Sequence, residues 1–161
     1  MFTRKKSSVY KRDTSTLFDH SMEMAGTLKG VTFINDSRSI RVNNTWESLR
    51  SLDLSTKNTL LILGGQDRGV DYSILKEMIE KKVKGLICLS SDSDSMYMQF
   101  RRECEFFAHA ISVEESVTIA AVYGKSGDVV LFSPGCPSFD AFDNYKNRGD
   151  QFKNALRKHI R

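Results

Sequence analysis

Four short polar segments carry most of the side chains in this 161-residue chain that could bind a ligand, and each follows directly on an apolar run. They are Asn-Asp-Ser-Arg at 35–38, Gly-Gly-Gln-Asp-Arg-Gly at 64–69, Ser-Ser-Asp-Ser-Asp-Ser at 90–95 and Ser-Pro-Gly-Cys-Pro-Ser at 133–138. Arginines and hydroxyls of this kind bind carboxylates and other anions. Ligands of an open parallel sheet bind beyond the carboxyl ends of its strands. The four loops should therefore share one edge of a sheet, and that edge is the candidate site.

The glycines of segment 64–69 have the outer spacing of a Walker A loop, but the rest of that motif is absent. Val70 and Asp71 stand where Lys and Ser or Thr would contact phosphate and Mg²⁺. A second partial match, Gly-Lys-Ser at 124–126, lacks its upstream glycine because position 119 is Ile. The residues alone therefore show no nucleotide-binding fingerprint. A tight turn after a strand explains Gly64 and Gly65 equally well.

Catalytic groupings are sparse. His20 and His159 lie near the ends of the chain and His109 has apolar neighbours, so none is a persuasive general base. Ser138 could be a nucleophile, but no His/Asp partner is indicated. It could instead cap a helix beginning at Phe139, a position where a hydroxyl and backbone N–H groups also converge on an anion. We predict no catalytic residue and no metal site, and the three separated cysteines form no zinc-binding pattern.

Short β-branched runs alternate with amphipathic stretches, which predicts an α/β, Rossmann-like single domain. We expect a mostly parallel sheet with helices on both faces and an N-terminal hairpin. Expected strands are 31–35, 59–63, 85–89, 107–111 and 128–132, with the hairpin strand at 22–26. Expected helices begin at caps Asn44, Asp71 and Asp94, the last reaching Cys104, and others cover 114–123, ended by Gly124, and the C-terminal segment containing Phe152, Leu156 and Ile160.

The charge is unevenly distributed. The chain has 24 Lys and Arg against 20 Asp and Glu, and five of the basic residues lie within positions 1–12, where there is no acid. The remainder is close to neutral and has no nucleic-acid-binding motif, so we expect no nucleic-acid partner. Apolar runs are too short to cross a bilayer and no signal peptide is visible, which predicts a cytoplasmic protein without a membrane partner. We expect a basic arm at 1–20 and one folded domain at 21–161.

Three ordered segments together resemble a known family. They are Gly30–Ser37, Leu61–Gly69 and Leu131–Phe142, the last continued by Asn144-Tyr145 and by Arg148–Phe152. These segments are similar to the C-terminal domain of the Mur ligases, and most similar to the members that add D-glutamate. The resemblance covers roughly residues 22–160.

The resemblance implies a domain that binds the incoming amino acid and closes over ATP held by a central domain. In the family, ATP phosphorylates the carboxylate of a UDP-sugar substrate, UDP-N-acetylmuramoyl-L-alanine, and the amine of D-glutamate attacks the acyl phosphate during peptidoglycan synthesis. By position, Asp36 matches an acid that reaches the nucleotide ribose. Arg38 and Arg68 match lysines that bind or orient the amino-acid carboxylates, and the residues that close around D-glutamate match Ser138, Phe139 and Tyr145.

The chain departs from the family pattern in the first segment. Where the family typically reads Asp-Ser-Lys-Ala-Thr-Asn, this chain reads Asp-Ser-Arg-Ser-Ile-Arg at 36–41, so Ile40 lacks a carboxylate-binding hydroxyl. The acceptor could therefore be D-glutamate or a similar acidic amino acid. The family's UDP-sugar-binding and ATP-binding domains, with the Mg²⁺ ligands, have no counterpart in these residues. We expect the chain alone to bind no cofactor and to have no ligase activity. The alternative is a free-standing binding or interaction module derived from this domain.

Overall fold

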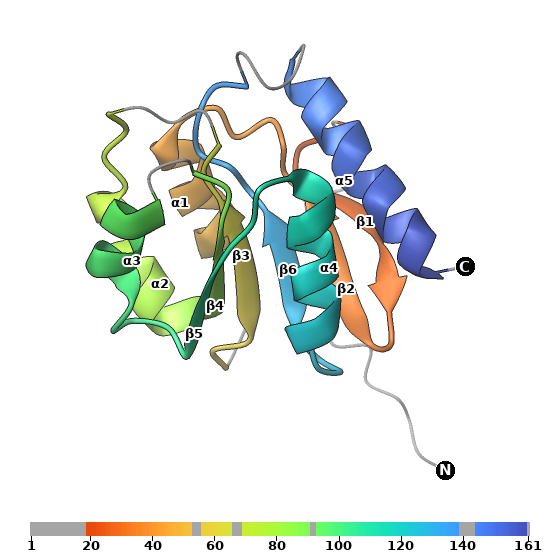
Figure 1. Ribbon diagram of the computed structural model, residues 1–161, viewed down its shortest axis with the longest axis horizontal. Helices are drawn as coiled ribbons and strands as arrows, with labels where there is room; N and C mark the ends of the chain where they lie inside the picture. The colour runs from red at the N-terminus through yellow and green to blue at the C-terminus, as the bar shows by residue number, and fades with distance from the viewer. Residues whose placement is uncertain (1–18, 53–55, 66–68, 91–92, 139–143, 161) are drawn as a thin grey trace.

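The computed structural model describes residues 19–52, 56–65, 69–90, 93–138 and 144–160. Within them, six strands form one sheet in the order β1-β2-β6-β3-β4-β5 (Figure 1). All neighbouring strands are parallel except the pair β1 and β2. The strands are β1 (Glu23–Leu28), β2 (Val31–Asn35), β3 (Thr59–Leu63), β4 (Val83–Cys88), β5 (Phe106–His109) and β6 (Val129–Phe132). The α/β, Rossmann-like prediction is confirmed.

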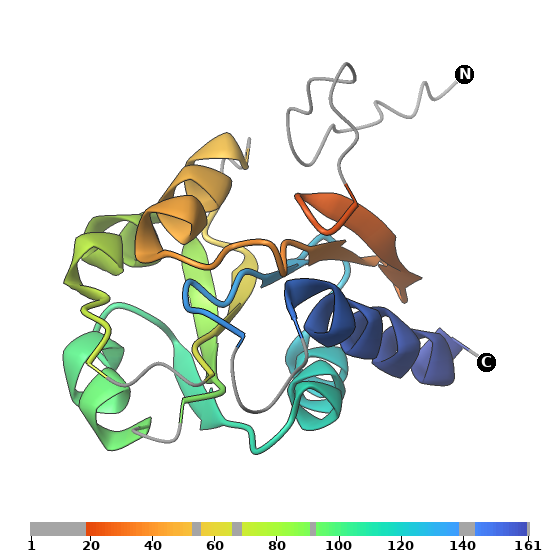
Figure 2. The same ribbon diagram turned by 90° about the horizontal axis from the view of Figure 1, so that it is seen from above.

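Helices cover both faces of the sheet, because the central strands are buried on both sides. One core lies under α1 (Val42–Ser51), α2 (Lys76–Lys82) and α3 (Ser93–Phe100), where Leu49, Ile79 and Phe100 are buried. The other lies under α4 (Val113–Tyr123) and α5 (Tyr145–Ile160), which run side by side (Figure 2). There Phe152 stacks on Phe132 with ring centroids 4.9 Å apart. No helix in the described ranges is long and apolar enough to cross a membrane.

The N-terminal hairpin forms as predicted, with a shorter turn. Strand β1 extends to Leu28, so the turn consists of Lys29 and Gly30, which have φ of 49° and 80°. Two consecutive positive φ values are typical of the two-residue turn whose twist matches a β-hairpin. Gly30 has a second reason to lack a side chain, because a Cβ there would lie 2.3 Å from Oγ of Ser126.

Some helix boundaries differ from the sequence prediction for identifiable physical reasons. Helix α1 begins at Val42 with Arg41 as its N-cap, and Asn44 lies at its third position, where its side chain accepts a hydrogen bond from the Arg41 N–H. Helix α3 ends at Phe100 and not at Cys104. No Gly or Pro marks that end. The chain leaves the helix because the N–H of Glu105 donates to the carbonyl of Lys84 and begins the pairing of β5 with β4.

The strand order creates a crevice at the carboxyl edge of the sheet. Strand β6 comes last in the sequence but lies between β2 and β3. The chain leaves β2 toward α1 on one face, whereas the next described helix after β6, α5, covers the other face. Adjacent strands whose connections diverge to opposite faces leave an opening between their ends, and ligands of α/β proteins bind at such a point.

Candidate functional site

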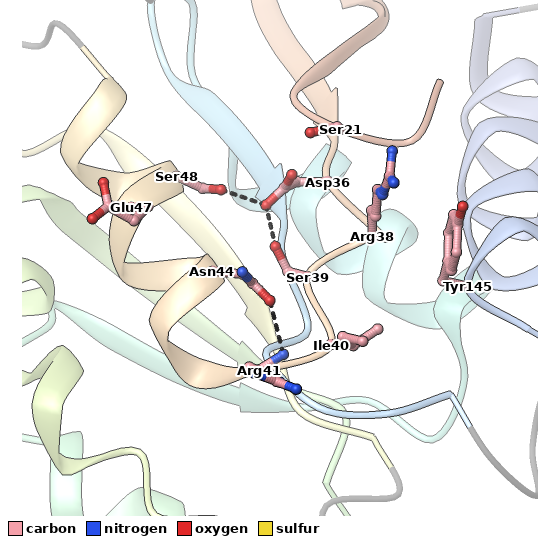
Figure 3. Close-up of a pocket in the computed structure, with 10 residues that line it drawn as sticks. All are labelled: Ser21, Asp36, Arg38, Ser39, Ile40, Arg41, Asn44, Glu47, Ser48 and Tyr145. Atoms are coloured by element: carbon pink, nitrogen blue, oxygen red, sulfur yellow. Dashed lines mark hydrogen bonds between the residues drawn. The ribbon is translucent and has the colours of Figure 1, made fainter. Parts of the chain in front are cut away.

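The loops that follow β2 and β6 meet at this opening. The N–H of Asp36 donates to the carbonyl of Phe132 at 2.8 Å, and the N–H of Gly135 donates to the carbonyl of Ser39 at 3.0 Å. Beside them lies a pocket of about 630 Å³, which Figure 3 shows. It is lined by Ser21, Asp36, Arg38, Ser39, Ile40, Arg41, Asn44, Glu47, Ser48 and Tyr145. Of the four polar segments expected at this edge, the one at 35–38 lines the pocket, and the one at 133–138 is hydrogen-bonded to it and to Gly64.

Asp36 is the buried acid of the pocket, with only 3% of its surface exposed. Its Oδ2 accepts hydrogen bonds from the hydroxyls of Ser48 at 2.6 Å and of Ser39, both drawn in Figure 3. It accepts a third from the hydroxyl of Ser133 at 2.7 Å. Its Oδ1 accepts one, from the N–H of Met22 at 3.1 Å. A carboxylate has about four lone-pair sites, so Oδ1 retains room for one further donor. Through Asp36, the network joins the ends of β2 and β6 to α1.

Burial raises the pKa of the Asp36 carboxyl, and the hydrogen bonds from the three serines only partly oppose this effect. An acid whose folded-state pKa is raised binds a proton more tightly when folded than when unfolded. Its contribution to stability is complete below the unfolded pKa of about 4 and is lost as pH rises through the folded pKa.

We therefore expect the cost of Asp36→Asn to shrink as pH rises, by about 1.4 kcal/mol per unit of pH between those two pKa values. Urea unfolding of both proteins at pH 4, 6 and 8 measures this. Asp71→Asn is the matched control, because hydrogen bonding to Ser73 lowers the pKa of that exposed carboxyl, and its cost should grow with pH. A cost of Asp36→Asn that stays constant or grows with pH would contradict the prediction.

Arg38 lies on an exposed stretch of the loop whose backbone is fixed from both sides. Its own N–H donates to the carbonyl of His20 at 3.0 Å. The preceding and following carbonyls, of Ser37 and Ser39, accept hydrogen bonds from the guanidinium of Arg148, at 2.8–3.1 Å. Arg148 projects from α5 and is only 2% exposed. The backbone that carries the Arg38 side chain is thus held from both sides, an arrangement that favours binding geometry.

Tyr145 holds the Arg38 side chain from the α5 side. The Arg38 guanidinium carbon lies over the Tyr145 ring, 5.8 Å from its centroid. The ring of His20 packs edge-on against the ring of Tyr145, and the two ring centroids lie 6.1 Å apart. His20 is itself buried, and its Nδ1 lies 3.0 Å from the Asn35 amide nitrogen and 3.2 Å from Oγ of Ser37. The contact with Tyr145 places the Arg38 guanidinium, a planar group that can pair with a carboxylate, at the α5 side of the pocket.

The sequence-predicted residues divide into three groups. Asp36, Arg38 and Tyr145 line the same pocket. Ser138 is half-buried on the loop after β6 and is not among the residues that line it. Arg68 and Phe139 lie outside the described residues. Their roles, and the roles of the other four residues, stay predictions.

Three structural residues of the site were missed by sequence reasoning. His20 was set aside because it lies near the end of the chain, although it anchors the Arg38 loop. Arg148 has a detectable signal, because it lies four residues before Phe152 and would share the apolar face of the helix. Ser133 lies in the polar segment 133–138 that was expected at this edge, but nothing in the sequence indicates that its hydroxyl bonds to Asp36.

No protein-family model matches the chain. Over 137 residues it is 42% identical to the UDP-N-acetylmuramoylalanine–D-glutamate ligase of Porphyromonas gingivalis, covering 85% of this chain and 30% of that protein. The ligase of the same name from Bacteroides fragilis is 36% identical over 141 residues, covering 87% of this chain and 31% of that protein. The chain therefore spans about 30% of the length of the curated relatives it matches.

Solved structures share the fold at low sequence identity. A MurF ligase from Thermotoga maritima in complex with ADP matches with a TM-score of 0.56 at 16% identity, over 86% of this chain and 31% of that one. A murein peptide ligase from Psychrobacter arcticus matches with a TM-score of 0.54 at 10% identity, over 88% of this chain and 29% of that one. The resemblance inferred from the three sequence segments is confirmed, and the chain belongs to the Mur ligase family as a counterpart of its C-terminal domain.

Proposed function

We propose that this domain binds the incoming amino acid of an ATP-dependent ligase that adds D-glutamate to UDP-N-acetylmuramoyl-L-alanine in peptidoglycan synthesis. The observation that carries the proposal is the pocket wall formed by Arg38 and Tyr145, next to the fixed loop 37–39. A guanidinium presents a planar fork of N–H donors that matches a carboxylate. Relatives at 36–42% identity are named for D-glutamate ligation, which supports this choice of amino acid.

The domain's contribution to the reaction is positioning. Arg38 would hold one carboxylate of the amino acid, and the rigid loop would fix where its amine points. Holding two reactants in the right orientation removes much of the entropic cost of bringing them together.

The nucleotide would meet this domain only at its ribose. The free lone-pair capacity of Asp36 Oδ1 fits one ribose hydroxyl, and Asp36 lines the pocket. In the described part of the chain no group of three or more His, Cys, Asp or Glu side chains could hold a metal ion. ATP, when bound, supplies the phosphoryl group that activates the carboxylate of the UDP-sugar substrate. We place its phosphates and Mg²⁺ on the ATP-binding domain of the parent enzyme, which lies beyond these residues.

Titration of the ¹⁵N-labelled chain with D-glutamate tests the proposal. We expect weak binding, because such sites close fully only when all substrates are present. Peak shifts should concentrate at Arg38, Ser39 and Tyr145. Arg38→Ala should weaken binding about tenfold or more, because it removes a charge-assisted pair of hydrogen bonds.

Arg157→Ala is the matched control, since Arg157 lies exposed in the last turn of α5. It should bind D-glutamate as the unaltered chain does. Shifts confined to other surfaces, with the Arg38 loop unmoved, would contradict amino-acid binding at this pocket. Such a result would favour an interaction module instead.

A further inference from the structure

Arg41 adds a second cation to the pocket wall. It lies three residues after Arg38 on the same loop, its side chain is exposed, and helix α1 begins at the next residue. The first turn of α1 contains no acidic residue. The N-terminus of a helix carries a partial positive charge, so a cation placed there is unfavourable unless an anion joins it. Arg41 and the N-terminus of α1 therefore place positive charge together at this end of the pocket.

The acids of the pocket do not neutralise Arg41. Oε2 of Glu47 pairs with Nε of Arg50 at 3.4 Å, on the exposed side of α1. Asp36 is buried and holds its hydroxyl network. Among the residues that the structure describes, no ion pair involves the guanidinium of Arg41. A mobile, charged ligand is the remaining source of negative charge.

We infer that Arg41 binds the second carboxylate of a dicarboxylic amino acid, and that Arg38 binds the first. The inference rests on the proposed function and names the feature that selects the substrate. Ile40 is 42% exposed and offers no hydrogen bond at the position where the family pattern has a hydroxyl. Arg41, where that pattern has Asn, supplies a bidentate donor one residue further along the loop. Compared with the family pattern, Ile40 and Arg41 thus replace a neutral hydroxyl contact to the carboxylate with a charged guanidinium contact.

Binding of D-glutamate and its two monoamides to the full 161-residue chain tests the inference. Arg41→Asn should raise the Kd for D-glutamate about tenfold to a hundredfold, the usual range for a lost charge-assisted pair. One of the two amides, D-glutamine or D-isoglutamine, lacks the carboxylate that Arg41 binds. The Kd for that amide should not change in Arg41→Asn.

Restoring the hydroxyl gives a second, independent readout. Ile40→Thr in the Arg41→Asn background should recover part of the lost affinity for D-glutamate, because it recreates the family's neutral contact. Arg157→Asn removes the same charge from an exposed site on α5 and should leave every Kd unchanged. The amide spectrum of each variant shows that it is folded, so that lost affinity reports on the pocket.

The outcomes separate this inference from the proposed function. If Arg41→Asn binds D-glutamate as tightly as the unaltered chain, or weakens both amides equally, Arg41 does not select a carboxylate, although the proposed function stands. If the unaltered chain binds no D-glutamate at the pocket, both fail. If Arg41→Asn raises the Kd for D-glutamate and for only one of the amides, and Ile40→Thr partly restores the affinity for D-glutamate, Arg41 binds the second carboxylate.

Discussion

Replacing Arg148 with Met should lower the free energy of unfolding by about 2–4 kcal/mol, because hydrogen bonds from a charged donor to buried carbonyls contribute about 1.5–3 kcal/mol. The guanidinium is only 2% exposed and donates to the carbonyls of Ser37 and Ser39. Burial lowers its pKa, but an arginine remains charged at neutral pH. Met fills similar space yet leaves the Ser37 carbonyl without this donor and the Ser39 carbonyl with only the N–H of Gly135, and the loop that carries Arg38 loses these hydrogen bonds to α5.

Urea unfolding followed by circular dichroism measures this effect. Arg157→Met on the same helix is the control, because that side chain is exposed and should cost under about 1 kcal/mol. Arg148→Lys should give an intermediate loss, since an ammonium cannot reproduce the planar fork. If Arg148→Met proves too unstable to purify, the free energy of unfolding of Arg148→Lys still tests the prediction. A loss below about 1 kcal/mol in both would show that the arginine does not hold the loop.

Gly149→Ala should destabilise the protein by about 2–3 kcal/mol, although the same change inside a helix normally stabilises by about 1 kcal/mol. A Cβ at this position would lie 2.2 Å from both Nδ1 of His20 and Oγ of Ser37. His20 is a buried ring, so it cannot move aside without disturbing Asn35 and Tyr145. The absent side chain lets α5 approach the loop closely enough for Arg148 to reach it.

A double variant separates the steric effect from helix propensity. Ser37→Ala removes one of the two clashing atoms, so Ser37→Ala with Gly149→Ala should be more stable than the sum of the single costs predicts. Lys146→Ala, at an exposed position of the same helix, should change stability by less than about 0.5 kcal/mol. Chemical denaturation of the original protein and of these four variants provides the comparison. A Gly149→Ala protein as stable as the original would mean that α5 can shift away without cost.

The fold could be predicted from the sequence because its signals are local. Alternating apolar runs identified the strands, and apolar spacing of three to four residues identified the helices. Asp71 was correctly placed near the start of a helical segment, where its Oδ1 accepts from the N–H of Ser73 at 2.9 Å. The end of α3 could not be predicted, because it is set by the pairing of β5 with β4 and not by a residue in the helix itself.

The candidate site was predictable only in part, since its geometry depends on contacts across the chain. The rule that polar loops gather at the carboxyl edge brought Asp36 and Arg38 to the correct place. Nothing in the neighbouring sequence indicates that Ser133 bonds to Asp36, or that His20 packs beside Tyr145. Those pairings follow from the insertion of β6 between β2 and β3, which a strand prediction alone does not give.

That insertion also sets the order in which the pocket can be assembled as the chain folds. The hydrogen bond from Ser133 to Asp36 joins residues 97 positions apart, and the Arg148 contact with Ser37 joins residues 111 positions apart. Such distant contacts slow folding because a large loop must close before they form. Strands β3, β4 and β5 can pair with near neighbours first, whereas the gap beside β2 stays open until β6 enters it. The Arg38 loop is thus completed by the last strand and helix, so the pocket is among the last parts of the domain to form.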